Sequence, residues 1–405
     1  MHLYLHIPFC HQACHYCDFH FSTNTASKSD LVNSICREIA LQKDYLGDKI
    51  LKTIYFGGGT PSLLTSEELE KILNTIHLYF SIENEAEITL EANPEDLNPT
   101  YLSDLKTLGI NRLSIGIQSF QEENLSFLNR NHSSAQALTC ISKAQDIGID
   151  NISIDLIYGI PGNELKDLTS DINMAVDTKI NHISAYSLTI EPKTVFGQQK
   201  KKGVFKELPE AIQSQKFSFT RNLLAEKGFE AYETSNFAKN QQYSKHNTSY
   251  WNQESYLGIG PSAHSFNQVS RQWNVAKNGV YTKAIKEGSI PAEIEILTEA
   301  NKINEYIMTR LRTKWGIEYS KIEQAFTQLK VETPEDLFNN WQNKEWAHVS
   351  NGHLILTETG ALMADKLAAD LIKQLTSPDG PEIQKVVVSE AGASVYSASE
   401  FASQE

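Results

Sequence analysis

Three cysteines lie close together near the start of the chain, in the run HIPFCHQACHYCDF. Cys10, Cys14 and Cys17 are separated by three and then by two residues. Three thiolates on one short loop can hold three irons of a 4Fe–4S cluster, whereas most iron–sulfur clusters and structural zinc sites take four protein ligands. The fourth iron would then be open to a small molecule. The spacing therefore predicts a reactive cluster rather than a passive one.

The residues alone leave other interpretations of these cysteines open. The loop could bind zinc with a histidine as fourth ligand, and the nearby candidates are His6, His11, His15 and His20. A disulfide framework is disfavoured, because five cysteines are an odd and small number for 405 residues. Cys36 and Cys140 fall in helical patterns beside apolar neighbours, so we expect them to be ordinary core residues.

Further candidate residues follow the ends of predicted strands. Residues 57–60 form a glycine run, GGGT, which lets backbone amides approach a ligand, although such a run can also be a tight turn. Glu91 could pair with a cationic or hydroxyl group, or it could be a surface acid. Arg130 is suited to binding a carboxylate. Asp155 lies in the apolar run ISIDLIYGIPG and needs a polar partner, and Gln118 ends another strand.

Strand-like and helical runs alternate through the first 230 residues. The strands are expected at 3–7, 53–56, 87–92, 112–119, 152–159 and 182–188, and the helices at 29–46, 65–80, 100–108, 134–147, 164–178 and 210–228. Six such units predict an α/β fold, a parallel sheet curled into a partial barrel with helices outside. Ligands bind at the carboxyl ends of parallel strands, so the candidate residues should meet on one rim.

Composition narrows the class of protein. The formal net charge is 36 − 50 = −14, which makes a large nucleic-acid footprint or contact with anionic lipid unfavourable. No apolar run approaches the roughly 18 residues that span a bilayer. The first residues enter a strand directly and show no secretory signal pattern. We therefore expect a cytoplasmic protein in a reducing compartment.

The pattern changes after about residue 230. Residues 231–295 are predicted to be a loop-rich connecting segment, dense in aromatic residues and glycine. Residues 296–376 are predicted to be a mainly helical, winged-helix-like domain, because a hairpin-like SNGHLIL precedes a long helical run. Packing or partner contact is its expected role. Residues 377–405 are predicted to be an extraneous or disordered tail, whose VSEAGASVYSAS resembles a fragment of a Tex-type transcription accessory protein.

The motifs YLHIPFC, GGGTPS, IGIQSF and IDLIYGIPG together resemble the radical SAM superfamily, and within it the coproporphyrinogen dehydrogenase-like group. The resemblance covers residues 1 to about 375. It implies a partial (βα)6 barrel, a 4Fe–4S cluster on the three loop cysteines, and S-adenosylmethionine as cofactor. It also implies cofactor contacts by Tyr4, Tyr16, Gly58, Gly59, Thr60, Glu91, Gln118, Arg130 and Asp155. It assigns no residue a catalytic role.

Two branches of this group differ in ways that the sequence can test. The coproporphyrinogen III dehydrogenases carry a further cysteine two residues past the third cluster cysteine and an N-terminal extension, whereas this chain has Phe19 and only nine residues before Cys10. The heme chaperone branch reads CDF at this point and carries HNxxYW, present here as HNTSYW at 246–251. The chain is closer to the heme chaperones, and it also has their SNFA and GIGPSAHS runs.

The resemblance to the heme chaperones implies heme as a further ligand. The expected partner is a heme-acceptor protein, such as a respiratory cytochrome component, with transient membrane-protein contact, a homodimer and no nucleic acid. His246 could be an axial ligand, and Tyr250 and Trp251 could contact the macrocycle. Alternatively the motif is structural, with its histidine hydrogen-bonded, and His264 has the same ambiguity. Radical decarboxylation of coproporphyrinogen III and a zinc-stabilised binding module stay open as rival functions.

Overall fold

The computed structural model describes residues 1–329, 334–375, 387–388 and 395–396. The chain forms two compact units. The first contains residues 1–230, 237–249 and 254–296, so it includes most of the segment predicted to be a connection. The second contains 231–236, 250–253 and the described residues from 297 onward. Apart from two pairs of residues, the predicted tail 377–405 lies outside the described residues.

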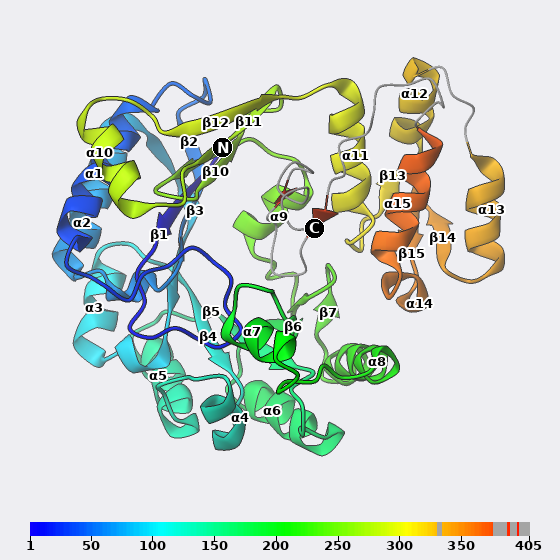
Figure 1. The fold of residues 1–405 in the computed structure, drawn as a ribbon, viewed down its shortest axis with the longest axis horizontal. Coiled ribbons are helices and arrows are strands. Elements are labelled where there is room, and N and C mark those ends of the chain that lie inside the picture. Colours follow the sequence, from blue (N-terminus) through cyan, green and yellow to red (C-terminus); the bar gives the residue numbers. More distant parts are fainter. Residues whose placement is uncertain (330–333, 376–386, 389–394, 397–405) are drawn as a thin grey trace. The chain divides into compact units, whose positions relative to one another are not determined.

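The first unit is an α/β structure on a mainly parallel sheet (Figure 1). Six strands pair in parallel in chain order: β1 (His2–Ile7), β2 (Ile50–Gly58), β3 (Ser81–Ala92), β4 (Arg112–Gln118), β5 (Asn151–Tyr158) and β6 (His182–Ser187). The helices between and after them are α1 (Lys28–Leu41), α2 (Ser66–Tyr79), α3 (Pro99–Thr107), α4 (Glu122–Phe127), α5 (Ser134–Asp146), α6 (Leu165–Asp177), α7 (Val195–Lys201) and α8 (Glu210–Glu226). The predicted α/β fold with six β-then-α units is confirmed.

Local signals explain where several helices begin. The Thr65 side chain accepts a hydrogen bond from the backbone of Glu68, whose side chain accepts one from the Thr65 backbone, so a capping box starts α2. Ser133 and Gln136 form the same arrangement at the start of α5. Each box satisfies backbone N–H groups that the first turn of a helix leaves open. Because the capping boxes fix where α2 and α5 begin, they also hold the preceding loops at the rim of the sheet.

The two faces of the sheet differ in polarity. Along β1, Leu3, Leu5 and Ile7 are fully buried. Because side chains alternate along a strand, His2 and His6 lie on the opposite face, where they also are almost completely buried. The helices cover the outside of the curved sheet (Figure 1), so the polar side chains line its inner face. The candidate site is built on this polar interior.

The sheet extends beyond β1 in a way that the sequence did not predict. β9 (Tyr256–Ile259) pairs with β1 in parallel, and three antiparallel strands follow, β10 (His264–Phe266), β11 (Ser270–Asn274) and β12 (Ala292–Ile296). α10 (Asn278–Lys286) connects the last two strands. Two short strands, β7 (Glu230–Ala231) and β8 (Asn236–Ala238), and the helix α9 (Lys245–Trp251) lie where the chain passes between the units.

A buried carboxylate attaches this extension to the barrel. Glu38 on α1 is fully buried and accepts hydrogen bonds from Gln42 Nε2 (3.0 Å) and Asn274 Nδ2 (2.7 Å). It also accepts from the backbone of Gly260 (2.8 Å) and the hydroxyl of Tyr281 (2.5 Å). Burial raises the pKa of Glu38, and the four donors oppose this rise. One side chain thus joins α1, the GIGPSAH loop, β11 and α10.

Replacing Glu38 by alanine is expected to destabilise the first unit by at least about 3 kcal/mol, because several buried donors lose their acceptor at once. Urea denaturation followed by circular dichroism measures this change. Glu70→Ala on the exposed side of α2 is the matched control and should leave the midpoint nearly unchanged. Equal midpoints for the two variants would show that this network contributes little to stability.

The second unit is mainly helical, as predicted. Its helices are α11 (Glu299–Arg310), α12 (Tyr319–Leu329), α13 (Glu335–Asn343), α14 (Glu358–Ala361) and α15 (Ala364–Gln374), and its small antiparallel sheet contains β13 (Ile317–Glu318), β14 (Ala347–Ser350) and β15 (His353–Leu356). The SNG turn of the predicted hairpin has positive φ angles at Asn351 and Gly352, which suits these residue types. Ile307, Phe326 and Trp341 lie in its buried core. β16 (Val387–Val388) and β17 (Val395–Tyr396) pair with each other.

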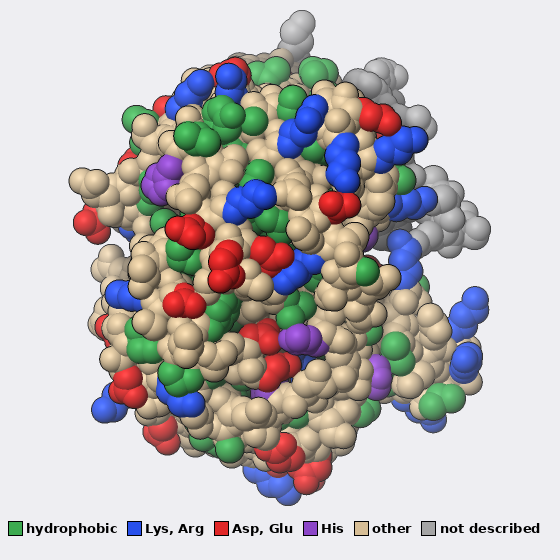
Figure 2. Space-filling model, turned by 90° about the vertical axis from the view of Figure 1, so that its left-hand side faces the viewer, with side chains coloured by type: hydrophobic (Ala, Val, Ile, Leu, Met, Phe, Trp, Pro, Cys, Tyr) green, Lys and Arg blue, Asp and Glu red, His purple; other side chains and the backbone are tan. Residues whose placement is uncertain are grey.

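The surface carries both signs of charge. On the face seen in Figure 2, acidic and basic side chains both occur, alongside hydrophobic ones. Within the described residues, no helix is both long and apolar enough to cross a membrane.

Candidate cluster and cofactor site

The cysteine loop follows β1 and has backbone hydrogen bonds at its start and within it. The backbone of Cys10 donates to Ser22 O (3.1 Å), and the backbone of Cys17 donates to Cys14 O (3.4 Å). In its middle, Gln12 Nε2 donates to Asn129 O (2.9 Å), and Asn129 Nδ2 donates back to Ala13 O (2.7 Å). The loop is therefore clamped against the segment that follows α4, and its three cysteines are half-buried.

Two polar side chains donate to the cysteine sulfurs. Thr60 Oγ1 lies 3.4 Å from Cys10 Sγ, and Arg130 Nη1 lies 3.3 Å from Cys14 Sγ. Burial raises the pKa of Cys10 to about 11, although the Thr60 hydroxyl opposes this, and burial raises the pKa of Cys17 to about 12. Both thiols are thus protonated at neutral pH without iron, so metal binding would release protons.

The three thiols suit a multi-iron cluster. Across residues 1–329 and 334–375, no three His, Cys, Asp or Glu side chains could together hold one metal ion. A 4Fe–4S cluster does not need three side chains on one metal ion, because each thiolate binds a different iron. The positive guanidinium beside Cys14 and the hydroxyl beside Cys10 would offset negative charge on the cluster.

The predicted aromatic residue of the loop rests on an apolar base. Tyr16 packs against a cluster formed by Leu128, Ile157, Ile160, Leu188, Phe196 and Phe205. The backbone of Phe196 donates to His15 O (3.0 Å), and the His15 and Phe196 rings meet edge to face at 5.4 Å. Burial raises the pKa of the Tyr16 phenol well above its ordinary value. This base keeps one side of the cysteine loop away from water.

The glycine run at the end of β2 is required by the close approach of other groups to Gly58. Gly58 has a φ of 113°, and a Cβ on it would lie 2.7 Å from the His6 ring. Its backbone N–H donates to Glu91 Oε2 (3.1 Å), while Tyr55 OH donates to Glu91 Oε1 (2.8 Å). Tyr4 stacks on Tyr55 with ring centroids 6.1 Å apart. Burial raises the pKa of Glu91 to about 7. The predicted residues of the first three strands therefore meet on one rim.

The predicted residues of the later strands reach the same interior. Gln118 has a φ of 68° at a register shift between β4 and β5. Arg130 Nη2 donates to Asn93 Oδ1 (2.6 Å) and Gly116 O (2.7 Å), while the buried Nε has no hydrogen-bond partner among the described residues. Burial raises the pKa of Asp155 to about 6, opposed by a hydrogen bond from Ser184. An unpaired donor and two half-buried carboxyls are suitable contacts for an amino acid carrying both charges.

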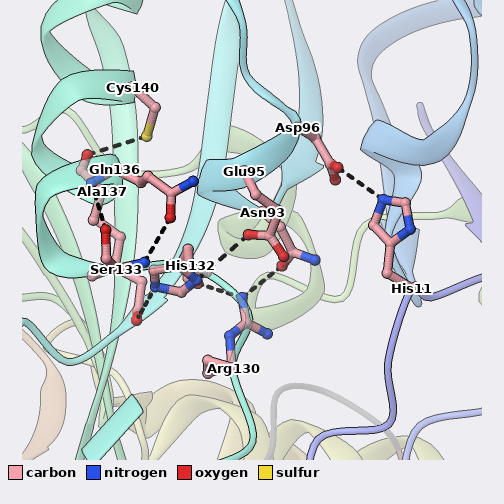
Figure 3. Close-up of polar contacts among 12 residues, drawn as sticks. His11, Asn93, Glu95, Asp96, Arg130, His132, Ser133, Gln136, Ala137 and Cys140 are labelled. Carbon is pink, nitrogen blue, oxygen red and sulfur yellow. Dashed lines mark hydrogen bonds and ion pairs between the residues drawn. The ribbon is translucent and has the colours of Figure 1, made fainter. Parts of the chain in front are cut away.

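Two residues of the rim were missed by the sequence reasoning. Asn93 and Asp96 lie in the NPED run directly after β3, and Figure 3 shows the first beside Arg130 and the second beside His11. His11 Nε2 lies 3.0 Å from Asp96 Oδ1, and Ser62 Oγ donates to Asp96 Oδ2 (2.6 Å). Their position at a strand end was the available signal, the same one that identified Glu91.

The histidine of HNTSYW is buried within the first unit. His246 is 1% exposed, its Nδ1 lies 2.6 Å from Thr53 Oγ1, and its ring stacks on Tyr55 at 4.8 Å. This placement favours the structural interpretation over axial ligation of heme. Tyr250 is half-buried and Trp251 is 7% exposed, and both belong to the second unit.

His264 is likewise packed within the first unit. Its ring stacks on Trp273 at 6.2 Å, and burial lowers its pKa to about 4. A neutral, stacked imidazole of this kind is typical of a structural histidine.

Comparisons with known proteins agree with this geometry. Residues 4–175 match the Radical SAM superfamily, and residues 334–405 match the Tex protein YqgF-like domain. The chain is 33% identical to heme chaperone HemW of Bacillus subtilis over 375 residues, 92% of this chain and 99% of that one. It is 34% identical to heme chaperone HemW of Lactococcus lactis over 324 residues, 80% of this chain and 84% of that one. Among solved structures, coproporphyrinogen III oxidase (HemN) of Escherichia coli, a radical SAM enzyme, superimposes with a TM-score of 0.78 at 21% identity, covering 91% of this chain and 89% of that one.

Proposed function

The chain belongs to the heme chaperone HemW family, and from this premise we propose that it binds a 4Fe–4S cluster, S-adenosylmethionine and heme, and transfers heme to an acceptor protein. The observation that carries the proposal is the similarity to a heme chaperone along 92% of the chain. The acceptor is a protein that needs heme, such as a respiratory cytochrome component. We place the transfer in the cytoplasm.

The cluster would be held by Cys10, Cys14 and Cys17. S-adenosylmethionine would contact the rim that surrounds them, with its carboxylate near Arg130 and its ammonium or ribose near Glu91. When bound, the cluster supplies one-electron chemistry at its open iron. The protein's own contribution is to orient these groups and to keep them partly out of water. The remaining predicted contacts are Tyr4, Tyr16, Gly58, Gly59, Thr60, Gln118 and Asp155.

The rival function is oxidative decarboxylation of coproporphyrinogen III. The fold of the enzyme HemN favours it, since the two chains superimpose over most of their length. Phe19 argues against it, because this position lacks the further cysteine of the coproporphyrinogen dehydrogenases.

In a heme chaperone, the cluster and S-adenosylmethionine would gate heme transfer or the oligomeric state, including a homodimer. Contact with a membrane protein would accompany delivery of heme.

Heme binding without porphyrinogen turnover is the expected result for the anaerobically reconstituted protein. A heme titration followed by absorption spectroscopy should saturate near one heme per chain, and a parallel assay with coproporphyrinogen III, S-adenosylmethionine and a reductant should give no protoporphyrinogen. His246→Ala tests the histidine of the HNTSYW motif, and we expect heme binding to persist. Turnover without stable heme binding would make the protein a decarboxylase instead.

A further inference from the structure

A continuous set of polar contacts joins two of the three cluster cysteines. Thr60 Oγ1 donates to Cys10 Sγ at 3.4 Å, and Arg130 Nη1 donates to Cys14 Sγ at 3.3 Å. Asn93 lies between the two donors. Its Oδ1 accepts from Arg130 Nη2 at 2.6 Å, and its Nδ2 donates to Thr60 Oγ1 at 3.5 Å. One amide therefore contacts both side chains that contact the sulfurs.

The orientation of this amide follows from chemistry. A guanidinium has only donors, so the carbonyl oxygen of Asn93 must face Arg130. The amide nitrogen then faces Thr60 and occupies a lone pair of its hydroxyl oxygen. The hydroxyl hydrogen is left for Cys10 Sγ. Figure 3 shows the Asn93 side chain directed at the guanidinium. In this arrangement the Asn93 oxygen accepts from Arg130, the Asn93 nitrogen donates to Thr60, and the Thr60 hydroxyl donates to Cys10.

The backbone around Asn93 is fixed by separate contacts. Its N–H donates to Ser62 Oγ (3.2 Å), and the short helix η2 (Pro94–Asp96) begins at the next residue. Within this helix, Glu95 Oε2 lies 3.5 Å from Nδ1 of the buried His132 ring. Asn93 therefore sits on a rigid segment, which a side chain needs if it is to hold others in place.

We propose that Asn93 is a positioning residue that holds one hydrogen-bond donor on each of two cluster thiolates and thereby sets the reduction potential of the cluster. The inference rests on the proposed cluster site. Hydrogen bonds to the sulfurs stabilise the reduced cluster more, because it carries the greater negative charge, and so they raise the potential. Loss of Asn93 should then make the cluster harder to reduce without removing any ligand.

Potentiometric titration of the anaerobically reconstituted protein, followed by electron paramagnetic resonance, tests this role. Asn93→Ala should shift the midpoint potential to a more negative value with the iron content unchanged. Asn93→Asp should shift it further, since the new carboxylate adds negative charge and draws the Thr60 hydrogen away from Cys10. Asn33→Asp on the exposed side of α1 changes the net charge equally and is the matched control.

A third variant changes Thr60, which Asn93 contacts, instead of Asn93 itself. Thr60→Val removes the donor to Cys10, so combining it with Asn93→Ala should lower the potential by less than the sum of the two single shifts. Midpoints of the Asn93 variants equal to that of Asn33→Asp would overturn the proposal. Failure of the unmodified protein to assemble a cluster would contradict the proposed function itself. Because Asn93→Asp preserves the side-chain shape, it still tests the proposal if Asn93→Ala fails to fold.

Discussion

Replacing Cys14 by serine is expected to abolish cluster assembly. The predicted site has three thiolates and no fourth, so the loss of one leaves two irons without a protein ligand. A serine hydroxyl is a poor substitute, because iron–sulfur clusters are held by thiolates. Iron and acid-labile sulfide should fall from about four per chain to near zero.

Cys36 provides the matched control for this experiment. It is a half-buried cysteine on α1, and its Sγ makes only a long contact of 3.9 Å to Lys71 O. Cys36→Ser should therefore keep the cluster absorption band and full iron content after anaerobic reconstitution. If Cys14→Ser also kept full iron and sulfide, the ligand assignment would be wrong.

Local patterns explain why the barrel could be predicted closely. The helix expected at 65–80 is Ser66–Tyr79, and the one expected at 134–147 is Ser134–Asp146. Both begin at capping boxes, which involve residues only three apart. The strands were recognisable because apolar residues such as Leu3 and Leu5 recur at alternate positions. Parallel connection then places the carboxyl ends of all six strands at one edge, so the convergence of Cys10, Gly58 and Glu91 follows from the topology.

The parts that could not be predicted depend on contacts between distant residues. Thr53 and His246 are 193 positions apart, and no local pattern indicates that the histidine would be buried against β2. The antiparallel extension is fixed by Glu38, whose partner Asn274 is 236 positions away. Asn93 was overlooked for the related reason that its role appears only when Thr60 and Arg130 are placed around it. Tertiary contacts of this kind leave no periodic signal in the sequence.

The affinity for S-adenosylmethionine is expected to fall as the pH drops through 7, with Glu91 as the cause. Burial raises the pKa of this carboxyl to about 7 when no ligand is bound. A cationic or hydroxyl partner favours the ionised form, so protonation competes with binding. The ionised fraction changes from about nine-tenths at pH 8 to about one-tenth at pH 6, which predicts an affinity about tenfold weaker at the lower pH.

Glu91→Gln separates this effect from other titrations. The amide keeps the side-chain shape but loses the charge that the Tyr55 hydroxyl and the Gly58 backbone both contact, so affinity at pH 8 should fall by about 10- to 100-fold. Calorimetry on reconstituted protein at pH 6, 7 and 8 gives the dissociation constants. Asp155 and the ligand titrate in both the variant and the unmodified protein. The ratio of their dissociation constants at each pH therefore isolates the contribution of Glu91. That ratio should shrink about tenfold from pH 8 to pH 6, whereas a constant ratio would place the ligand away from this carboxylate.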